Sequence, residues 1–424
     1  MGHDTIFALS SGRPPAAISV IRVSGPVAHA AAREMAGSLP DARAAAVLRL
    51  HHPRSGDLLD EAVVLRFDAP ASATGEDIVE LQCHGGRAVV DAVLVALAAI
   101  DGLRPAVPGE FTRRAFENGR IDLTEAEGLA DLIEAETESQ RKAALALSEG
   151  GLRKQIAVWQ QSLLGLSAEA ERAIDYDEAD DDADHALQRE CAAMAAELRS
   201  WLDRPRAERL KDGIRVVVAG PPNAGKSSLL NAIAGEDRAI VTDIPGTTRD
   251  HIEVPLALGG VPIVLTDTAG LRDPAGTVEA IGIARAATLI EAADILLWLG
   301  APGDAPDHPR TLKVHPKSDL GGAVLLGSIA VSSVTGEGVP ELLEQIGRIA
   351  RDLLPGEDAI AINRRQARCF EEAAGALDAA SAALEVPILA EELRHARSAF
   401  DCLTGRTGVE DLLDSLFSRF CLGK

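Results

Sequence analysis

The fold of the middle of the chain is decided by Ile214-Arg-Val-Val-Val-Ala-Gly-Pro-Pro-Asn-Ala-Gly-Lys-Ser-Ser-Leu-Leu-Asn-Ala-Ile-Ala234. Its apolar start, Ile214–Ala219, predicts a buried strand, and the residues after Ser227 recur at the spacing of a helix. Between them stands the pattern Gly-x4-Gly-Lys-Ser, in the strand–loop–helix context that a phosphate-binding loop requires. The glycines Gly220 and Gly225 allow successive backbone N–H groups to point at one anion, and the following helix adds the positive end of its dipole. We therefore predict a P-loop.

Side chains of this loop and of two later segments complete a triphosphate site. Lys226 can reach the β- and γ-phosphates as a point charge, and Ser227 can offer its hydroxyl to Mg2+, which prefers oxygen ligands. Asp267 suits a role just outside the Mg2+ shell, which Thr248 can complete only while a γ-phosphate is present; Gly270 can donate its N–H to that phosphate. The predicted nucleotide contacts are Asn223, Ala224, Gly225, Lys226, Ser227 and Ser228, then Thr242, Asp243, Ile244, Pro245, Gly246, Thr247 and Thr248, and finally Asp267, Thr268, Ala269 and Gly270.

The base-recognition segment departs from the usual Asn-Lys-x-Asp, because it reads Pro316-Lys-Ser-Asp319. Asp319 can still accept hydrogen bonds from the guanine N1–H and exocyclic amine, and Lys317 can lie over the base. Proline has no side-chain amide, so one base contact and one brace to the P-loop should be missing, which predicts weaker nucleotide binding. Ser332 and Ser333 match the second base-contacting loop. Guanine remains the predicted base, since adenine would present an acceptor to the Asp319 carboxylate.

The chain divides into four consecutive segments that differ in composition and in the spacing of their apolar residues. Residues 1–120 mix short β-rich runs with Gly and Pro turns and predict an α/β domain. Residues 121–212 are rich in Ala, Leu and Glu at helical spacing, and residues 213–354 alternate strands and helices in a doubly wound pattern. Residues 355–424 return to helix and end in Cys-Leu-Gly-Lys. This order predicts α/β domains combined with an all-α domain, in which the helical domain is interrupted by an inserted Ras-like P-loop G domain.

Composition narrows the class of protein. The chain has 424 residues, of which 46% are hydrophobic and 25% charged, as in a soluble globular protein with two or three domains. It shows no membrane-spanning run and no signal-peptide pattern, and its five cysteines are scattered, so we expect a cytoplasmic, reduced protein without membrane contacts. The net charge of -23 prevents the overall field from holding nucleic acid, so an RNA substrate would require a local basic patch or a partner protein.

Motifs in the middle and at both ends of the chain carry a family resemblance. Asp243-Ile-Pro-Gly-Thr-Thr-Arg-Asp250 and Asp267-Thr-Ala-Gly-Leu-Arg272 are shared by several Era-like GTPases. The chain end, Phe420-Cys-Leu-Gly-Lys424, is more specific, and Thr74-Gly-Glu-Asp-Ile-Val-Glu80 and Pro108-Gly-Glu-Phe-Thr-Arg-Arg-Ala-Phe116 point the same way. Over nearly its whole length the sequence resembles the MnmE (TrmE) family of tRNA-modifying GTPases.

The resemblance implies a fold, an activity and partners. Members of the family are homodimers through a tetrahydrofolate-binding N-terminal domain, whose ligand would be a 5-formyl- or 5,10-methylene-tetrahydrofolate. They form a heterotetramer with the FAD-dependent protein MnmG (GidA) and act on the wobble uridine of certain tRNAs. Carbon 5 of that uridine receives a carboxymethylaminomethyl or aminomethyl group. GTP hydrolysis is required and is promoted by K+-dependent dimerisation of the G domains.

The resemblance also implies catalytic roles at the nucleotide. The K+ ligands would be Asn223, Thr242, Ile244 and Thr247. A monovalent cation beside the phosphates can neutralise developing charge, as an arginine finger does elsewhere. Arg249 and Arg272 are alternative sources of that charge, and ion pairs that organise the switch loops explain them at least as well. Likewise, Glu279 matches the position that orients the attacking water, with a solvated glutamate as the equal alternative.

For the folate site, the matching positions are Arg22, Glu80 and Lys424, and Arg120 stands where the family usually has lysine. Arginine there keeps the charge and changes the geometry. Cys421 matches the terminal cysteine, for which a nucleophilic role and a small buried side chain are equal alternatives.

Three functions follow from these observations. The first is a GTPase that drives wobble-uridine modification. The second is an Era-like switch in ribosome assembly, but such switches usually carry a basic RNA-binding module that this acidic chain lacks. The third is a scaffold that binds nucleotide poorly, which the proline at 316 would explain.

Overall fold

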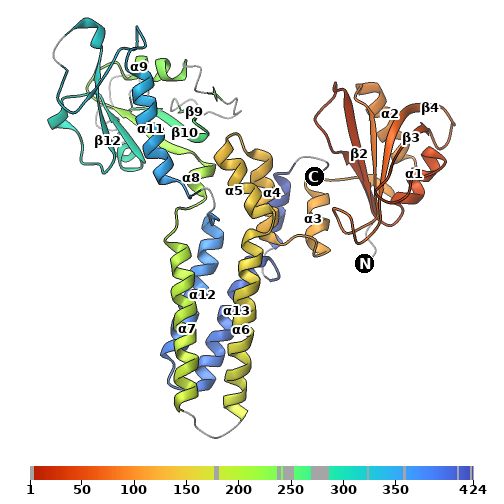
Figure 1. The fold of residues 1–424 in the computed structure, drawn as a ribbon. Coiled ribbons are helices and arrows are strands. Elements are labelled where there is room, and N and C mark those ends of the chain that lie inside the picture. The colour runs from red at the N-terminus through yellow and green to blue at the C-terminus, as the bar shows by residue number, and fades with distance from the viewer. Residues whose placement is uncertain are drawn as a thin grey trace, which may run out of the picture. The chain divides into compact units, whose positions relative to one another are not determined.

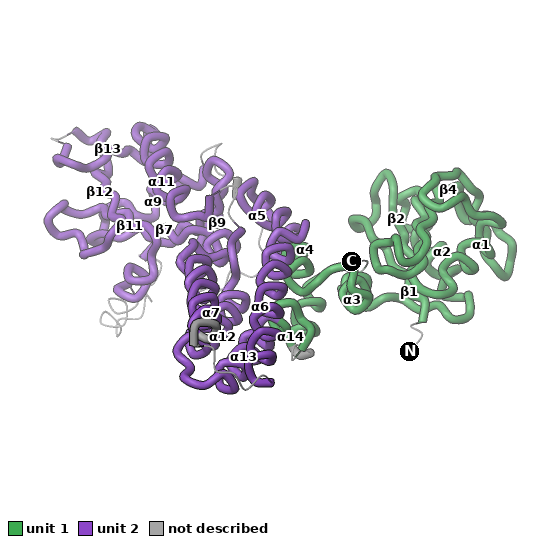
Figure 2. The backbone as a smooth tube through the Cα atoms, turned by 60° about the horizontal axis from the view of Figure 1, so that its bottom comes forward, with its two compact units in different colours: residues 1–130, 401–424 green, residues 131–400 purple. Residues whose placement is uncertain are grey.

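The computed structural model describes residues 4–175, 181–235, 240–241, 253–268, 286–321, 324–356, 360–407, 410–420 and 423. Contacts between residues divide the chain into two compact units, coloured separately in Figure 2. Unit 1 holds residues 1–130 and 401–424, and unit 2 holds residues 131–400. Within the described part of the chain, no helix is both long and apolar enough to cross a membrane.

Unit 1 is built on a six-stranded sheet in the order β3-β4-β5-β2-β1-β6. The strands are β1 (Thr5–Leu9), β2 (Ile18–Ser24), β3 (Ala45–His51), β4 (Leu58–Phe67), β5 (Ile78–His84) and β6 (Leu103–Pro105). Alternate side chains such as Ile21 and Leu81 join a core with helices α1 (Ala28–Ala36) and α2 (Arg87–Ala98). Because strand side chains alternate between faces, Arg22 and Glu80, which are cross-strand partners, lie on the face away from these two helices.

The two ends of the chain meet in a second core of unit 1. This core joins helix α4 (Leu123–Glu134) to helix α14 (Glu410–Ser418), and helix α3 (Glu110–Glu117) lies beside α14. The buried residues of this core are Leu123, Ala126, Ala130, Leu413, Leu416, Phe417 and Phe420. The C-terminal residues therefore complete the N-terminal unit.

Unit 2 contains long helices that run alongside one another (Figure 1). They are α6 (Gly151–Asp175), α7 (Asp181–Leu202), α12 (Arg364–Ala382) and α13 (Val386–Thr404), preceded by α5 (Glu138–Ser148). Aromatic rings fill their shared core: Trp159 packs edge-on against Trp201 at 5.3 Å and against Phe370 at 5.4 Å between ring centroids. Burial of these large rings supplies much of the apolar area that holds such helices together.

The rest of unit 2 is a seven-stranded sheet in the order β13-β12-β11-β7-β10-β9-β8. The strands are β7 (Ile214–Ala219), β8 (Ile240–Val241), β9 (Glu253–Leu258), β10 (Val261–Asp267), β11 (Ile295–Trp298), β12 (Thr311–Pro316) and β13 (Ile329–Val331), with helices α8 (Glu208–Lys211), α9 (Lys226–Ala234) and α11 (Val339–Leu353). Strands β13, β12, β11, β7 and β10 are parallel, and apolar cores lie on both faces of β7. This is the doubly wound arrangement expected from the sequence.

Candidate nucleotide-binding site

The P-loop connects β7 to α9 at the carboxyl end of the parallel strands, where ligands bind in open α/β sheets. Asn223 and Gly225 have positive φ angles of 59° and 97°, which curl the loop before the helix begins. Gly220 passes Leu299 so closely that an added Cβ would lie 3.1 Å from that side chain. Since α9 starts at Lys226, the positive end of its dipole lies at the loop. The geometry is that of an anion-binding cradle.

The lysine of the loop is buried and already oriented over it. The Lys226 side chain donates to the backbone oxygens of Gly220, at 3.0 Å, and Pro221, at 2.9 Å. Only 8% of the residue is exposed to solvent. A phosphate oxygen can replace these carbonyl acceptors with a gain in charge complementarity, since charge-assisted hydrogen bonds are the stronger kind.

Two oxygen groups suited to Mg2+ converge beside the lysine. The Ser227 hydroxyl donates to Oδ2 of Asp267 at 2.5 Å, although the two residues are far apart in the sequence. Asp267 ends β10 and is 1% exposed, while the neighbouring Thr268 hydroxyl donates to the Val218 carbonyl at 3.0 Å and holds this strand end beside β7. A hydroxyl and a carboxylate in contact form a donor set that fits a hard divalent cation.

The two predicted base-contacting loops also lie together. Ser332, which is fully buried, donates its hydroxyl to Asp319 at 2.6 Å, and this fixes the carboxylate that would face the base. Lys317 has a left-handed φ of 60° and donates from Nζ to the Asn223 carbonyl at 2.9 Å. The sequence predicted that Pro316 would remove a brace to the P-loop, and Lys317 provides a link between the same two loops. No sequence signal indicated this link.

Several predicted site residues lie outside the described residues, and their roles remain predictions. They are Thr242, Asp243, Ile244, Pro245, Gly246, Thr247, Thr248, Arg249, Ala269, Gly270, Glu279, Cys421 and Lys424. Of the other described members of the nucleotide set, Ala224 lies within the P-loop between Asn223 and Gly225, Ser228 lies in the first turn of α9, and Ser333 follows Ser332.

The predicted folate residues that the structure describes in unit 1 are Arg22, Glu80 and Arg120. Arg22 donates to Oε1 of Glu80 from Nε at 3.0 Å and from Nη2 at 2.7 Å, and its guanidinium lies 5.7 Å from the centre of the Phe111 ring. Arg120 is exposed, and its stem packs against Gly75. Gly423 touches the backbone of β1, because an added Cβ would lie 2.2 Å from the Leu9 carbonyl oxygen. The C-terminal segment therefore reaches the sheet of its own chain, next to the strand that carries Arg22.

Two buried cysteines among the described residues are unreactive in character. Cys83, Cys191 and Cys369 are buried, and Cys402 is half-buried. Burial raises the pKa of Cys83 to about 12, and burial also raises the pKa of Cys191 to about 11. Both are therefore thiols rather than nucleophilic thiolates at neutral pH.

A P-loop with a buried lysine, a serine–aspartate pair beside it and a lysine–aspartate base loop define a P-loop GTPase. The N-terminal family profile, described as "GTP-binding protein TrmE N-terminus", matches residues 5–120, and that of the "MnmE helical domain" matches residues 123–421. The chain belongs to the MnmE (TrmE) family.

Relatives of known name agree over their full length. The "tRNA modification GTPase MnmE" of Novosphingobium aromaticivorans is 51% identical, with 99% of this chain and 100% of the relative covered. The protein of the same name from Erythrobacter litoralis is also 51% identical, with the same coverage, and that of Zymomonas mobilis is 50% identical. Among solved structures, the G domain of the T. maritima FeoB iron transporter is 28% identical over 32% of this chain and 98% of its own, at a TM-score of 0.24.

Proposed function

We propose that this GTPase drives the addition of a carboxymethylaminomethyl or aminomethyl group to C5 of the wobble uridine of certain tRNAs, together with an FAD-dependent partner of the MnmG (GidA) kind. Relatives that share half of its residues over the whole chain are named for tRNA modification. The same full-length likeness favours this function over an Era-like switch in ribosome assembly. The proposal includes a cytoplasmic homodimer, with the G domain inserted into the helical domain.

The observation that carries the proposal is the contact between Ser227 and Asp267 beside the buried Lys226. These three side chains would hold Mg2+ and the β- and γ-phosphates of GTP. The ammonium of Lys226 offsets charge that develops on the transferred phosphoryl group, and the P-loop amides position it. Asp319, held by Ser332, would select guanine through its N1–H and amine. The link from Lys317 to the P-loop supports guanine binding despite Pro316.

Two further ligands belong to the proposal. K+ would lie beside Asn223, whose backbone already has the curled conformation of the loop, with Thr242, Ile244 and Thr247 as its other ligands. A tetrahydrofolate derivative would lie on the sheet face of unit 1 that carries Arg22 and Glu80. A carboxylate there can accept from the N–H groups of a pterin, and a guanidinium can pair with an anionic tail.

The test is a double substitution, Lys226→Ala with Ser227→Ala, in the full chain. We expect GTP hydrolysis to fall roughly 100-fold or more, because a preorganised electrostatic group is removed from the phosphates. The modified wobble nucleoside, measured by mass spectrometry of digested tRNA, should disappear in cells that carry only this variant. The matched control is Lys154→Ala, an exposed lysine on α6. Unchanged turnover and unchanged modification in the double variant would refute the proposal, and equal hydrolysis in K+ and Na+ would remove K+ from it.

A further inference from the structure

A cleft rich in arginine lies where the chain passes between the long helices and the seven-stranded sheet. It has a volume of about 720 Å3 and is formed by the segment after α7 and by the first turns of α12. The two segments are joined by a hydrogen bond from the Ala207 N–H to the Ile362 carbonyl at 3.1 Å. The residues that line the cleft are Asp203, Arg204, Pro205, Arg206, Glu208, Arg209, Arg364, Ala367, Arg368 and Glu371.

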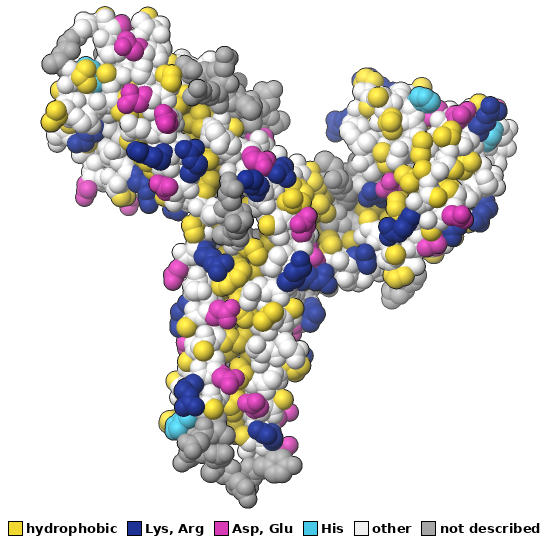
Figure 3. Space-filling view, viewed as in Figure 1, with side chains coloured by type: hydrophobic (Ala, Val, Ile, Leu, Met, Phe, Trp, Pro, Cys, Tyr) yellow, Lys and Arg dark blue, Asp and Glu magenta, His cyan; other side chains and the backbone are white. Residues whose placement is uncertain are grey.

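The charge of this cleft is opposite in sign to that of the molecule. Five arginines face three carboxylates, so the lining carries a net positive charge in a chain whose formal net charge is -23. Elsewhere both signs are interspersed over the visible face (Figure 3). Only a proline and an alanine in the lining are apolar. A protein partner normally needs an apolar centre in its interface, whereas a polyanion does not.

Three of the arginines have carboxylate neighbours that a stronger anion can displace. Arg206 lies 3.6 Å from Glu371, Arg209 lies 3.2 Å from Asp294, and Arg368 lies 3.0 Å from Glu372. These arginines are 36%, 40% and 80% exposed in their side chains. Exposed pairs of this kind contribute little to stability, about 0–1 kcal/mol each. A phosphate group, by contrast, matches the guanidinium fork with two parallel hydrogen bonds.

The other two arginines form no ion pair with any carboxylate that the structure describes. Arg364 is exposed at the first position of α12, and the first turn of this helix contains no acidic residue. The Arg364 N–H donates to the Glu208 carboxylate, so this helix start already holds one anionic oxygen beside the cleft. Arg204 is held with its guanidinium 3.9 Å from the centre of the Trp201 ring, so its orientation is fixed in advance.

We propose that this arginine cleft binds the phosphodiester backbone of RNA. The inference rests on the proposed function, since it names the surface that would hold the tRNA. A chain with this net negative charge needs a local basic patch or a partner protein to bind RNA, and the cleft would be such a patch. The cleft is lined by the segment between α7 and β7 and by the first turns of α12, so bound RNA would contact one connection to the seven-stranded sheet and the helix start that follows the other.

The test compares two variants of the full chain that each remove two exposed helix arginines. Arg364→Gln with Arg368→Gln alters the cleft, and Arg394→Gln with Arg397→Gln on α13 is the matched control. Binding of tRNA is measured from about 50 to about 200 mM salt. We expect the cleft variant to bind more weakly and to lower the slope of log K against log salt by about 2, and the control to keep the wild-type slope. GTP hydrolysis without RNA should be unchanged in both.

Equal tRNA affinity and slope in the cleft variant and the wild type would overturn the inference, and so would an equal loss in the control. A cleft variant that keeps tRNA but loses the flavoprotein would identify a protein interface instead. Competition by inorganic phosphate at constant ionic strength, if complete at millimolar concentration, would identify a small-anion site and also overturn it. If the wild type neither binds nor modifies tRNA, the proposed function itself fails.

Discussion

The stability of unit 1 depends on the charge of one buried residue, Glu110. It is 8% exposed at the start of α3 and accepts hydrogen bonds from Arg104 at 2.8 Å, from the Val107 N–H at 2.9 Å and from Arg114 at 3.0 Å. Burial raises the pKa of the Glu110 carboxyl, and the hydrogen bonds from Arg104, Val107 and Arg114 outweigh this effect, so its pKa lies below 4.5. The folded state therefore favours the ionised form.

This shift predicts an acid sensitivity with a definite sign. Because the folded-state pKa is depressed, the carboxylate stabilises unit 1 fully above about pH 4.5, and this contribution is lost as the pH falls through the folded pKa. We expect Glu110→Gln to lower the free energy of unfolding by about 2 kcal/mol at pH 7. The difference from wild type in urea titrations should shrink below pH 4.5. Glu117→Gln, at the exposed end of the same helix, is the control; a difference that stays constant with pH would contradict the prediction.

Among single residues, the sequence predicted those site residues that belong to a continuous local motif. Lys226 and Ser227 follow from spacing alone, because the loop that positions them is continuous in sequence. The sequence assigned Ser227 and Asp267 to one Mg2+ site, and the direct contact between their side chains is a finding of the structure. The bond from Lys317 to Asn223 could not be predicted, since it depends on a left-handed lysine and on the distance between two loops.

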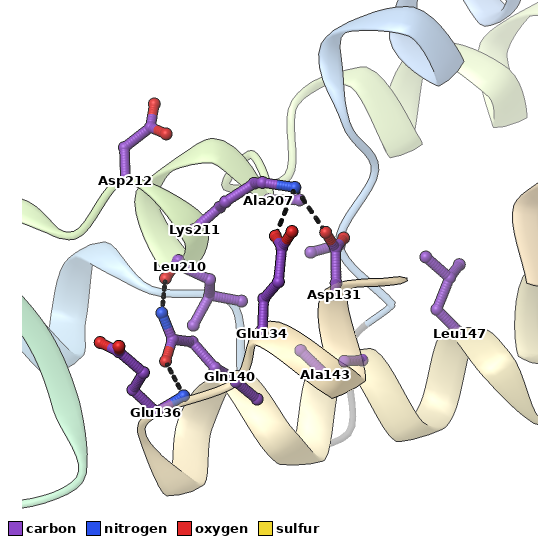
Figure 4. Close-up of a pocket in the computed structure, with 13 residues that line it drawn as sticks. Asp131, Glu134, Glu136, Gln140, Ala143, Leu147, Ala207, Leu210, Lys211 and Asp212 are labelled. Atoms are coloured by element: carbon purple, nitrogen blue, oxygen red, sulfur yellow. Dashed lines mark hydrogen bonds and ion pairs between the residues drawn. The ribbon is translucent and has the colours of Figure 1, made fainter. Parts of the chain in front are cut away.

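Helix α5 is the element that joins the long helices to both strands of the nucleotide site. Gln140 caps it by accepting from the Glu136 and Thr137 N–H groups, each at 2.9 Å, and donates to the Leu210 carbonyl of α8 at 2.9 Å (Figure 4). The neighbouring Ser139 N–H donates at 3.2 Å to Gly260, in the turn before β10. Since α8 precedes β7, and β10 ends at Asp267, α5 contacts residues that lie just before each of the two strands that carry the phosphate site.

Two substitutions separate the cap from the bond to α8. Gln140→Ala removes both and should lower the free energy of unfolding of unit 2 by about 1–2 kcal/mol. Gln140→Glu keeps an acceptor for the cap but cannot donate to the Leu210 carbonyl, so it should recover only part of that loss. Urea titrations with and without GTP measure both. A Gln140→Glu protein as stable as the wild type would show that the bond to α8 contributes nothing.

The elements themselves were predicted unevenly, for a physical reason. Strand β7 was expected at Ile214–Ala219 and has those bounds, and residues 355–424, which contain α12 and α13, were expected to be helical. Strand β3 was not among the expected elements, because Ala45-Ala-Val-Leu-Arg-Leu-His51 begins with residues that disfavour strands and alternates only weakly. It exists because β4 pairs with it along its length. The contact of Gln140 with α8 was also not predicted, since it joins residues that are far apart in the sequence.

For the whole molecule, the division into two units has a consequence for unfolding. Phe417, near the C-terminus, is 3% exposed and belongs to the core of the N-terminal unit, with its ring centre 6.3 Å from that of Phe116. Phe370 is fully buried in the aromatic core of unit 2, which also carries the nucleotide site. Each phenylalanine truncated to alanine should cost about 3–5 kcal/mol.

These two costs should appear in different calorimetric transitions. A nucleotide stabilises only the unit that binds it, by RT ln(1 + [L]/Kd), so GTP should raise the melting temperature of unit 2 alone. We expect Phe417→Ala to lower the transition that GTP does not move, and Phe370→Ala to lower the one that it does. If Phe417→Ala instead lowered the GTP-sensitive transition, the last residues of the chain would stabilise the nucleotide-binding unit, and the assignment of the C-terminal helix to the N-terminal unit would be wrong.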